Sequence, residues 1–189
     1  MTQNIENGDA SGMSRWRLIG WSAAALLLLL PLVAMQFTDE VVWDLTDFVV
    51  FGAMLGGVGL AFEFASRLSG KAPNKAAYKT GFGIALLAAF LLFWVNGAVG
   101  IIGSEDNDAN LMYYGIILVA VVGALIARFE PRGMALAMTV TAGAQVLAFV
   151  IALAAGWGFT GPITLFFGAL WAGSASLFRQ AAKEASGER

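Results

Sequence analysis

The chain has 189 residues, of which 59% are hydrophobic and only 13% are charged. Soluble domains are about 45–50% apolar and about 25% charged, so this composition, with a mean hydropathy of +0.75, excludes an ordinary soluble domain and indicates a membrane protein. The net charge of −2 argues against nucleic-acid binding, and the absence of Cys and His excludes disulfides, thiol nucleophiles and the usual zinc sites.

Six apolar segments follow one another along the chain, each close to the roughly 20 residues that cross a bilayer as a helix. They are not barrel strands, because apolar and polar residues do not alternate in them. The predicted spans are 18–37, 48–66, 81–102, 111–127, 133–155 and 163–178. We therefore expect an all-α, six-helix transmembrane bundle over residues 15–180, with a disordered cytoplasmic tail at 1–14 and a short cytoplasmic tail at 181–189.

The basic residues predict the orientation of the spans. All eleven Lys and Arg residues precede the first span, follow the sixth, or lie in the segments 67–79 and 128–132 after the second and fourth spans. The three loops on the other side carry only acidic residues or no charge. Because cytoplasmic loops are enriched in Lys and Arg, we expect both termini to be cytoplasmic.

A weak internal repeat is visible in the second, fourth and sixth spans. Each contains an aromatic residue followed by Gly, and each ends in an arginine; the pairs are Phe51-Gly52, Tyr114-Gly115 and Phe167-Gly168. Three successive αα-hairpins derived from one ancestor would give this pattern. Interfacial aromatics and small residues at helix contacts would also give it. The spacing of Gly52 and Gly56 further predicts a close helix–helix contact.

Three polar residues inside the spans are candidates for an intramembrane polar path: Glu63, Asn96 and Gln145. A carboxylate within a span often marks an ion or proton pathway. However, Arg67 lies one helical turn after Glu63, and an ion pair between them would explain the residue without a function. The two amides would more commonly form hydrogen bonds between helices.

The loop after the third span resembles the start of a calcium-binding loop. Asp106, Asp108 and Asn110 have the right alternation, but Leu111 and Ile117 stand where an EF-hand requires Gly and Glu. The chain therefore contains no EF-hand at this position.

A looser divalent-metal site in the acidic loops stays open as an alternative. Its candidate ligands are Glu105, Asp106, Asp108, Asp44 and Asp47. Turn and capping roles would explain these residues without a metal, and Asn110 and Asp47 stand where they could cap the helices that follow.

Most of the chain after about residue 15 resembles a known family. The resemblance is carried by the run from Trp94 to Asn107, with its Val-Gly-Ile-Ile-Gly-Ser-Glu-Asp-Asn loop, by residues 109–115 and 126–135, and by residues 32–41. The family consists of uncharacterised small polytopic inner-membrane proteins of bacteria. The resemblance implies a bacterial inner-membrane location, but no activity or site residue. Relatives often carry Pro where this chain has Asp108, which weakens that residue as an essential ligand.

Two classes of function remain. The first is a non-catalytic accessory, scaffold or subunit protein that contacts membrane lipids and other membrane proteins or copies of itself. The second is a small-solute or cation transporter or channel. No catalytic constellation and no cofactor motif is present in the sequence, and no nucleic-acid partner is expected.

Overall fold

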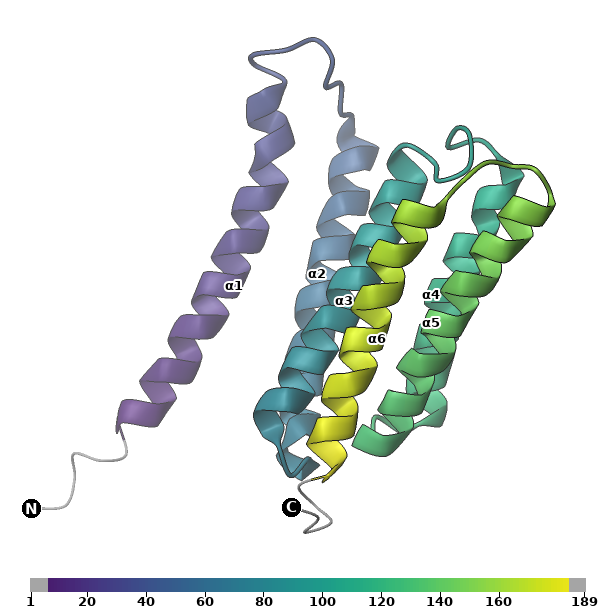
Figure 1. Cartoon of the computed structure of the whole chain (residues 1–189). Helices are drawn as coiled ribbons and strands as arrows, with labels where there is room; N and C mark the ends of the chain where they lie inside the picture. Colours follow the sequence, from purple (N-terminus) through teal and green to yellow (C-terminus); the bar gives the residue numbers. More distant parts are fainter. Residues whose placement is uncertain (1–6, 184–189) are drawn as a thin grey trace, which may run out of the picture. The chain divides into compact units, whose positions relative to one another are not determined.

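The computed structural model describes residues 7–183 as six long helices joined by short connections (Figure 1). The helices are α1 (Asn7–Ala34), α2 (Leu45–Leu68), α3 (Lys75–Ala98), α4 (Leu111–Ile126), α5 (Pro131–Ala154) and α6 (Gly161–Lys183), with 3-10 turns η1 (Ser69–Lys71) and η2 (Asp108–Asn110). All six helices are long and apolar enough to cross a membrane. The predicted all-α, six-helix architecture is therefore confirmed for the described residues.

Helix α3 is shifted toward the N-terminus relative to the predicted span 81–102. The helix begins at Lys75, because the Asn74 side chain accepts a hydrogen bond of 2.9 Å from the Ala77 N–H and caps the first turn. It ends at Ala98, just before Gly100, whose φ of +71° lies in the left-handed region. Gly100 thus ends α3, although the apolar residues that follow predicted a longer helix.

Helix α1 begins at Asn7, earlier than the predicted span 18–37. Residues 7–14, which we expected to belong to a disordered tail, continue the helix. Once an apolar segment has formed a helix, each added residue gains a backbone hydrogen bond at little further cost. Residues 1–6 of that predicted tail lie outside the described residues, as do residues 184–189 at the other end of the chain.

The chain forms two compact units, residues 1–61 and 62–189. In the first unit, α1 and α2 approach one another at glycines of α2. A Cβ added at Gly59 would lie 3.0 Å from the Trp21 ring, and one at Gly52 would lie 3.7 Å from Leu28. Gly56 has no such neighbour within 4 Å among the described atoms. Of the predicted pair Gly52 and Gly56, only Gly52 therefore contacts α1, and Gly59 makes the closer approach.

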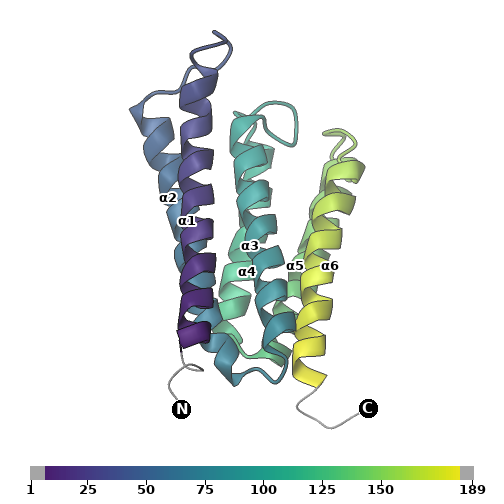
Figure 2. The same ribbon diagram turned by 90° about the vertical axis from the view of Figure 1, so that its left-hand side faces the viewer.

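The second unit contains α3, α4, α5 and α6, which run side by side (Figures 1 and 2). Helix α3 packs against α4 and α6, and α5 also packs against α4 and α6, so the four helices form a closed ring. Helix α3 packs more extensively on α6 than on α4. Helices α3 and α4 are therefore consecutive in the chain but do not form a closely packed hairpin, in contrast to the three-hairpin organisation.

The repeated aromatic–Gly pairs do not share a packing role. Gly52 approaches Leu28, whereas a Cβ added at Gly115 or Gly168 would meet no other residue within 4 Å among the described atoms. The geometry of the three glycines therefore gives no support to a common ancestral contact.

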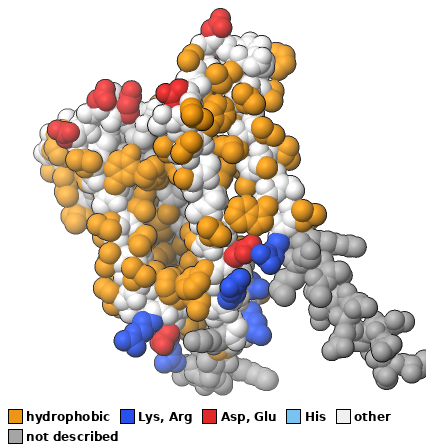
Figure 3. Space-filling model, turned by 180° about the vertical axis from the view of Figure 1, so that it is seen from behind, with side chains coloured by type: hydrophobic (Ala, Val, Ile, Leu, Met, Phe, Trp, Pro, Cys, Tyr) orange, Lys and Arg blue, Asp and Glu red, His pale blue; other side chains and the backbone are white. Residues whose placement is uncertain are grey.

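Charged side chains of the second unit gather at its two ends. The loop between α3 and α4, which carries Glu105, Asp106 and Asp108, lies at what we name the acidic end. The α2–α3 connection with the helix turns beside it, the α4–α5 turn and the end of α6 carry the Arg and Lys residues of this unit within 62–183, and they lie at the basic end. Figure 3 shows this separation, with hydrophobic side chains between the ends.

Candidate functional site

The space between α3, α4, α5 and α6 is filled by side chains from all four helices. Leu92 of α3, Tyr113 of α4, Met138 of α5 and Trp171 of α6 are each 1% exposed or less. Small buried residues on α5, such as Ala148, let the helices approach between these large side chains. The interior of the second unit is thus a packed core.

The three residues of the predicted polar path lie at different depths in this unit. At a rise of 1.5 Å per residue, Asn96 lies ~3 Å from the acidic end of α3, and Gln145 lies ~14 Å from the acidic end of α5. Glu63 lies ~8 Å from the basic end of α2 and is only partly buried. The structure does not bring the three side chains together.

Asn96 and Gln145 differ in their hydrogen bonding, although both are at most 1% exposed. The Asn96 side chain donates to the Asn110 carbonyl oxygen at 3.1 Å and so joins α3 to the start of α4. In contrast, neither amide atom of Gln145 has a partner within the described part of the chain. A buried polar group without a partner costs about 1–3 kcal/mol, so Gln145 is a polar position that the core does not satisfy.

Trp171 on α6 is a second polar position near Gln145. Its indole N–H is buried and has no partner among residues 7–183. Counted from the acidic ends of their helices, Trp171 lies ~15 Å along α6 and Gln145 ~14 Å along α5, so they are at similar depth.

Asn110 organises the acidic-end loop. It is 3% exposed, and its Oδ1 accepts hydrogen bonds from the N–H groups of Ile101 and Ile102 at 3.1 and 2.8 Å. Its Nδ2 donates to the carbonyl oxygens of Ile102 and Ser104 at 3.3 and 2.7 Å. One side chain thus satisfies four backbone groups of the loop. The prediction that Asn110 caps α4 is wrong, because its side chain makes no cap hydrogen bond.

The Asn110 side chain therefore points away from Asp106 and Asp108, with which it forms the calcium-loop-like alternation in the sequence. Its Oδ1 is directed inward to two backbone N–H groups, whereas Glu105, Asp106 and Asp108 are exposed. Within residues 7–183, no group of three or more acidic side chains is arranged to hold a metal ion. The sequence alternation at 106–110 therefore reflects a hydrogen-bonded turn.

In the first unit, Asp44 and Asp47 form a reciprocal cap at the start of α2. Asp44 Oδ1 accepts from the N–H groups of Thr46 and Asp47 at 2.7 and 3.0 Å, and Asp47 Oδ2 accepts from the Asp44 N–H at 2.9 Å. This is the capping-box arrangement, in which two side chains satisfy the free N–H groups of a helix start. The expected capping role of Asp47 is confirmed, and Asp44 shares it.

The basic end is held by contacts that the sequence did not reveal. The Tyr78 hydroxyl of α3 donates to the Phe129 carbonyl oxygen at 2.7 Å, in a turn where Arg128 and Phe129 have positive φ angles of 49° and 60°. Nearby, the Ser174 hydroxyl of α6 donates to the Gly81 carbonyl oxygen at 2.7 Å. Each bond joins segments more than 50 residues apart, and no local pattern could have indicated the pairing.

Comparisons with protein-family models, with curated proteins and with solved structures found no match to the chain.

Proposed function

We propose that the protein is a non-catalytic accessory, scaffold or subunit protein of a bacterial inner membrane, with its basic end in the cytoplasm. The resemblance to small bacterial membrane proteins supports the location. The enrichment of cytoplasmic loops in Lys and Arg supports the orientation. Its partners are membrane lipids and other membrane proteins, or further copies of itself.

The observation that carries this proposal is the filled interior of the second unit. Large side chains from all four helices meet there, and Trp171 is fully buried at a depth similar to that of Gln145. A transporter needs a water-filled or ligand-sized passage with converging polar groups. A packed interior favours a role in which the outer, lipid-facing helix surfaces make the functional contacts.

A small-solute or cation transporter is the second candidate, and one observation favours it. Gln145 and the Trp171 N–H are buried polar groups without partners inside the described part of the chain. In a transporter, a second conformation would admit water or solute to these groups. The two candidates therefore differ in whether Gln145 ever meets water.

Thiol labelling distinguishes the two candidates, because the natural chain has no Cys. A Gln145→Cys variant is treated with a small charged methanethiosulfonate in native membranes open on both sides. We expect labelling to be slower than at exposed Ser104→Cys by at least about a hundredfold. A buried thiol reacts only when the packed core opens, and an opening that costs about 3 kcal/mol reduces the reactive fraction by about that factor.

The matched control is Ala148→Cys, on the same helix and 4% exposed. Slow labelling of both variants supports the packed interior. Fast labelling of Gln145→Cys with slow labelling of Ala148→Cys would show a specific aqueous path and would contradict the proposal in favour of transport. Fast labelling of both would show that the interior of the unit is open to water and would contradict it as well.

A further inference from the structure

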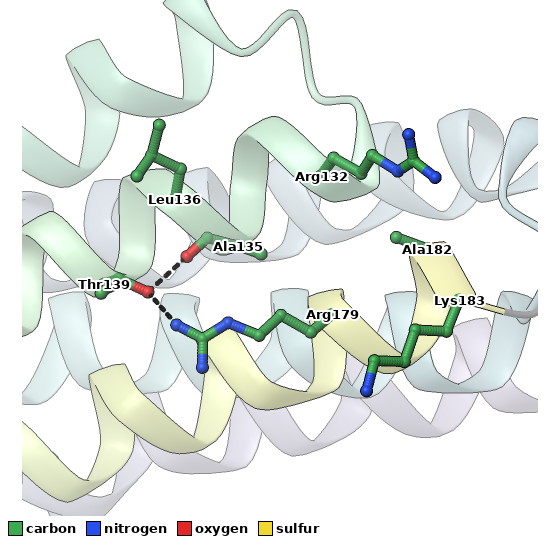
Figure 4. A pocket seen from close by; sticks show the side chains of 7 residues that line it. All are labelled: Arg132, Ala135, Leu136, Thr139, Arg179, Ala182 and Lys183. Atoms are coloured by element: carbon green, nitrogen blue, oxygen red, sulfur yellow. Dashed lines mark hydrogen bonds between the residues drawn. The ribbon is translucent and has the colours of Figure 1, made fainter. Parts of the chain in front are cut away.

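A pocket opens between α5 and α6 at the basic end, and three cationic side chains line it. It has a volume of about 360 Å³. Helix α5 contributes Arg132, Ala135, Leu136 and Thr139, and α6 contributes Arg179, Ala182 and Lys183 (Figure 4). The α5 residues lie at helical spacings of three and four, so they occupy one face of that helix. The pocket thus combines an apolar wall with positive charge from both helices.

Arg179 is held in this pocket by a relay of two hydrogen bonds. Its Nη2 donates to the Thr139 hydroxyl oxygen at 2.7 Å, and the Thr139 hydroxyl donates to the Ala135 carbonyl oxygen at 2.7 Å (Figure 4). A guanidinium has five N–H donors, and Thr139 occupies one of them. Because Thr139 fixes the side chain, other N–H groups can bind a ligand with little further loss of side-chain freedom.

The pocket differs from the general positive charge of the basic end. Positive-inside enrichment explains why Arg and Lys occur there, but it does not require residues of two helices to converge. Arg132 lies in the first turn of α5, whereas Arg179 and Lys183 lie in the last turns of α6. Glu130 precedes α5 but is not among the lining residues. Three cationic residues that line one pocket favour an anionic ligand with several oxygen atoms.

The surface next to the pocket indicates the kind of anion. Leu136, Val140 and Leu147 of α5 are 67%, 53% and 58% exposed, and they extend from the pocket toward the middle of the helix. Arg132 and Lys183 lie at the basic ends of the candidate spans α5 and α6, and the Arg179 guanidinium, bound to Thr139, lies within the span, ~12 Å from the start of α5. Positive charge that extends inward from the end of a span beside an exposed apolar stripe suits a phosphate joined to acyl chains.

We propose that this pocket binds the phosphate of an anionic phospholipid headgroup, with the acyl chains along Leu136, Val140 and Leu147. Arg179 and Lys183 pair with the phosphate oxygens, and Thr139 positions Arg179. Basic pockets between transmembrane helices at the cytoplasmic side are suited to anionic headgroups. This binding site goes beyond the proposed function, because a scaffold protein and a transporter could each have it.

Native mass spectrometry of the purified full chain tests the site by titration with phosphatidylglycerol and, separately, phosphatidylcholine. We expect preferential binding of phosphatidylglycerol. The double variant Arg179→Gln/Lys183→Gln should weaken that binding about 10- to 30-fold, because each basic side chain near anionic headgroups contributes about fivefold. The Thr139→Val variant keeps every charge but releases Arg179, and it should weaken binding about threefold or more.

The matched control is Arg67→Gln/Lys75→Gln, which removes two exposed charges at the basic end outside the pocket. We expect it to change the affinity less than about threefold. Equal losses in the two double variants would overturn the pocket in favour of general surface charge. Unchanged binding in Thr139→Val would also overturn it. Displacement of the lipid by inorganic phosphate at equal concentration would show a free-anion site and contradict a lipid ligand.

Discussion

Single amide side chains determine the local structure at the acidic end. The buried Asn110 side chain donates two hydrogen bonds to the loop backbone and accepts two from it. The backbone carbonyl oxygen of Asn110 also accepts a hydrogen bond from the Asn96 side chain. A loop at the end of a span has no neighbouring strand or helix turn to satisfy its backbone groups, and each one left unpaired is costly. The amide supplies two donors and two acceptor lone pairs, whereas a hydroxyl has a single donor and a carboxylate at neutral pH has none.

Replacing Asn110 by Ala should lower the free energy of unfolding by about 2–4 kcal/mol, because it leaves buried N–H groups of Ile101 and Ile102 without an acceptor. The measurement is unfolding by SDS titration in mixed micelles. The control is Asn107→Ala. Asn107 is exposed, and among the described residues its side chain accepts one hydrogen bond, from the Ala109 N–H, so its loss should cost about 1 kcal/mol or less. Equal effects of the two substitutions would contradict the organising role of Asn110.

At the scale of elements, the second unit depends on a close contact between α3 and α6. A Cβ added at Gly81 would lie 3.2 Å from Leu177 Cβ and 3.3 Å from the Ser174 carbonyl oxygen. These atoms cannot move without moving α6. The Ser174 hydroxyl also donates to the Gly81 carbonyl oxygen. Small residues that let two helices approach are a main source of affinity between helices in membranes.

Gly81→Leu should therefore destabilise the second unit by about 2–3 kcal/mol, because the added side chain forces α3 and α6 apart. Gly168→Leu is the matched control, since an added Cβ there meets no other residue within 4 Å among the described atoms. That substitution should leave stability unchanged or raise it by up to about 1 kcal/mol, because Leu is the better helix former. SDS titration measures both. If Gly168→Leu were the more destabilising variant, the proposed α3–α6 contact would be wrong.

The sequence was sufficient for the number and order of the helices, because continuous apolar segments indicate spans directly. It was not sufficient for α3, whose ends depend on the Asn74 cap and on Gly100 rather than on hydropathy. The sequence also could not predict the pairing of α3 with α6. Helices that are apolar on all sides have no distinct buried face, and the Ser174–Gly81 contact spans 93 residues of sequence.

The candidate site was less predictable than the fold. Glu63, Asn96 and Gln145 could be recognised as polar residues within spans, but their depths depend on helix boundaries and on register. The three cations of the α5–α6 pocket were predicted only as markers of orientation. They line one pocket because the start of α5 packs against the end of α6, and this packing could not be predicted from the sequence.

At the scale of the whole molecule, the side of the membrane that each loop occupies decides which surfaces can meet cytoplasmic partners and lipids. The acidic and basic loops alternate along the chain through six helices, so a consistent sidedness follows if every helix is a span. The proposed lipid pocket requires the basic end to face the cytoplasm, where anionic lipid attracts Lys and Arg. Orientation therefore connects the fold, the proposed function and the lipid site.

The measurement that tests this account most directly is labelling of single-Cys variants with a membrane-impermeant maleimide. Glu40→Cys and Ser104→Cys lie in exposed acidic loops, and Pro73→Cys lies in the exposed α2–α3 connection. In intact cells whose outer permeability barrier has been opened, we expect labelling of the first two variants, and labelling of Pro73→Cys only after lysis. Labelling of Pro73→Cys alone would reverse the orientation, and different sidedness for Glu40→Cys and Ser104→Cys would contradict six spans.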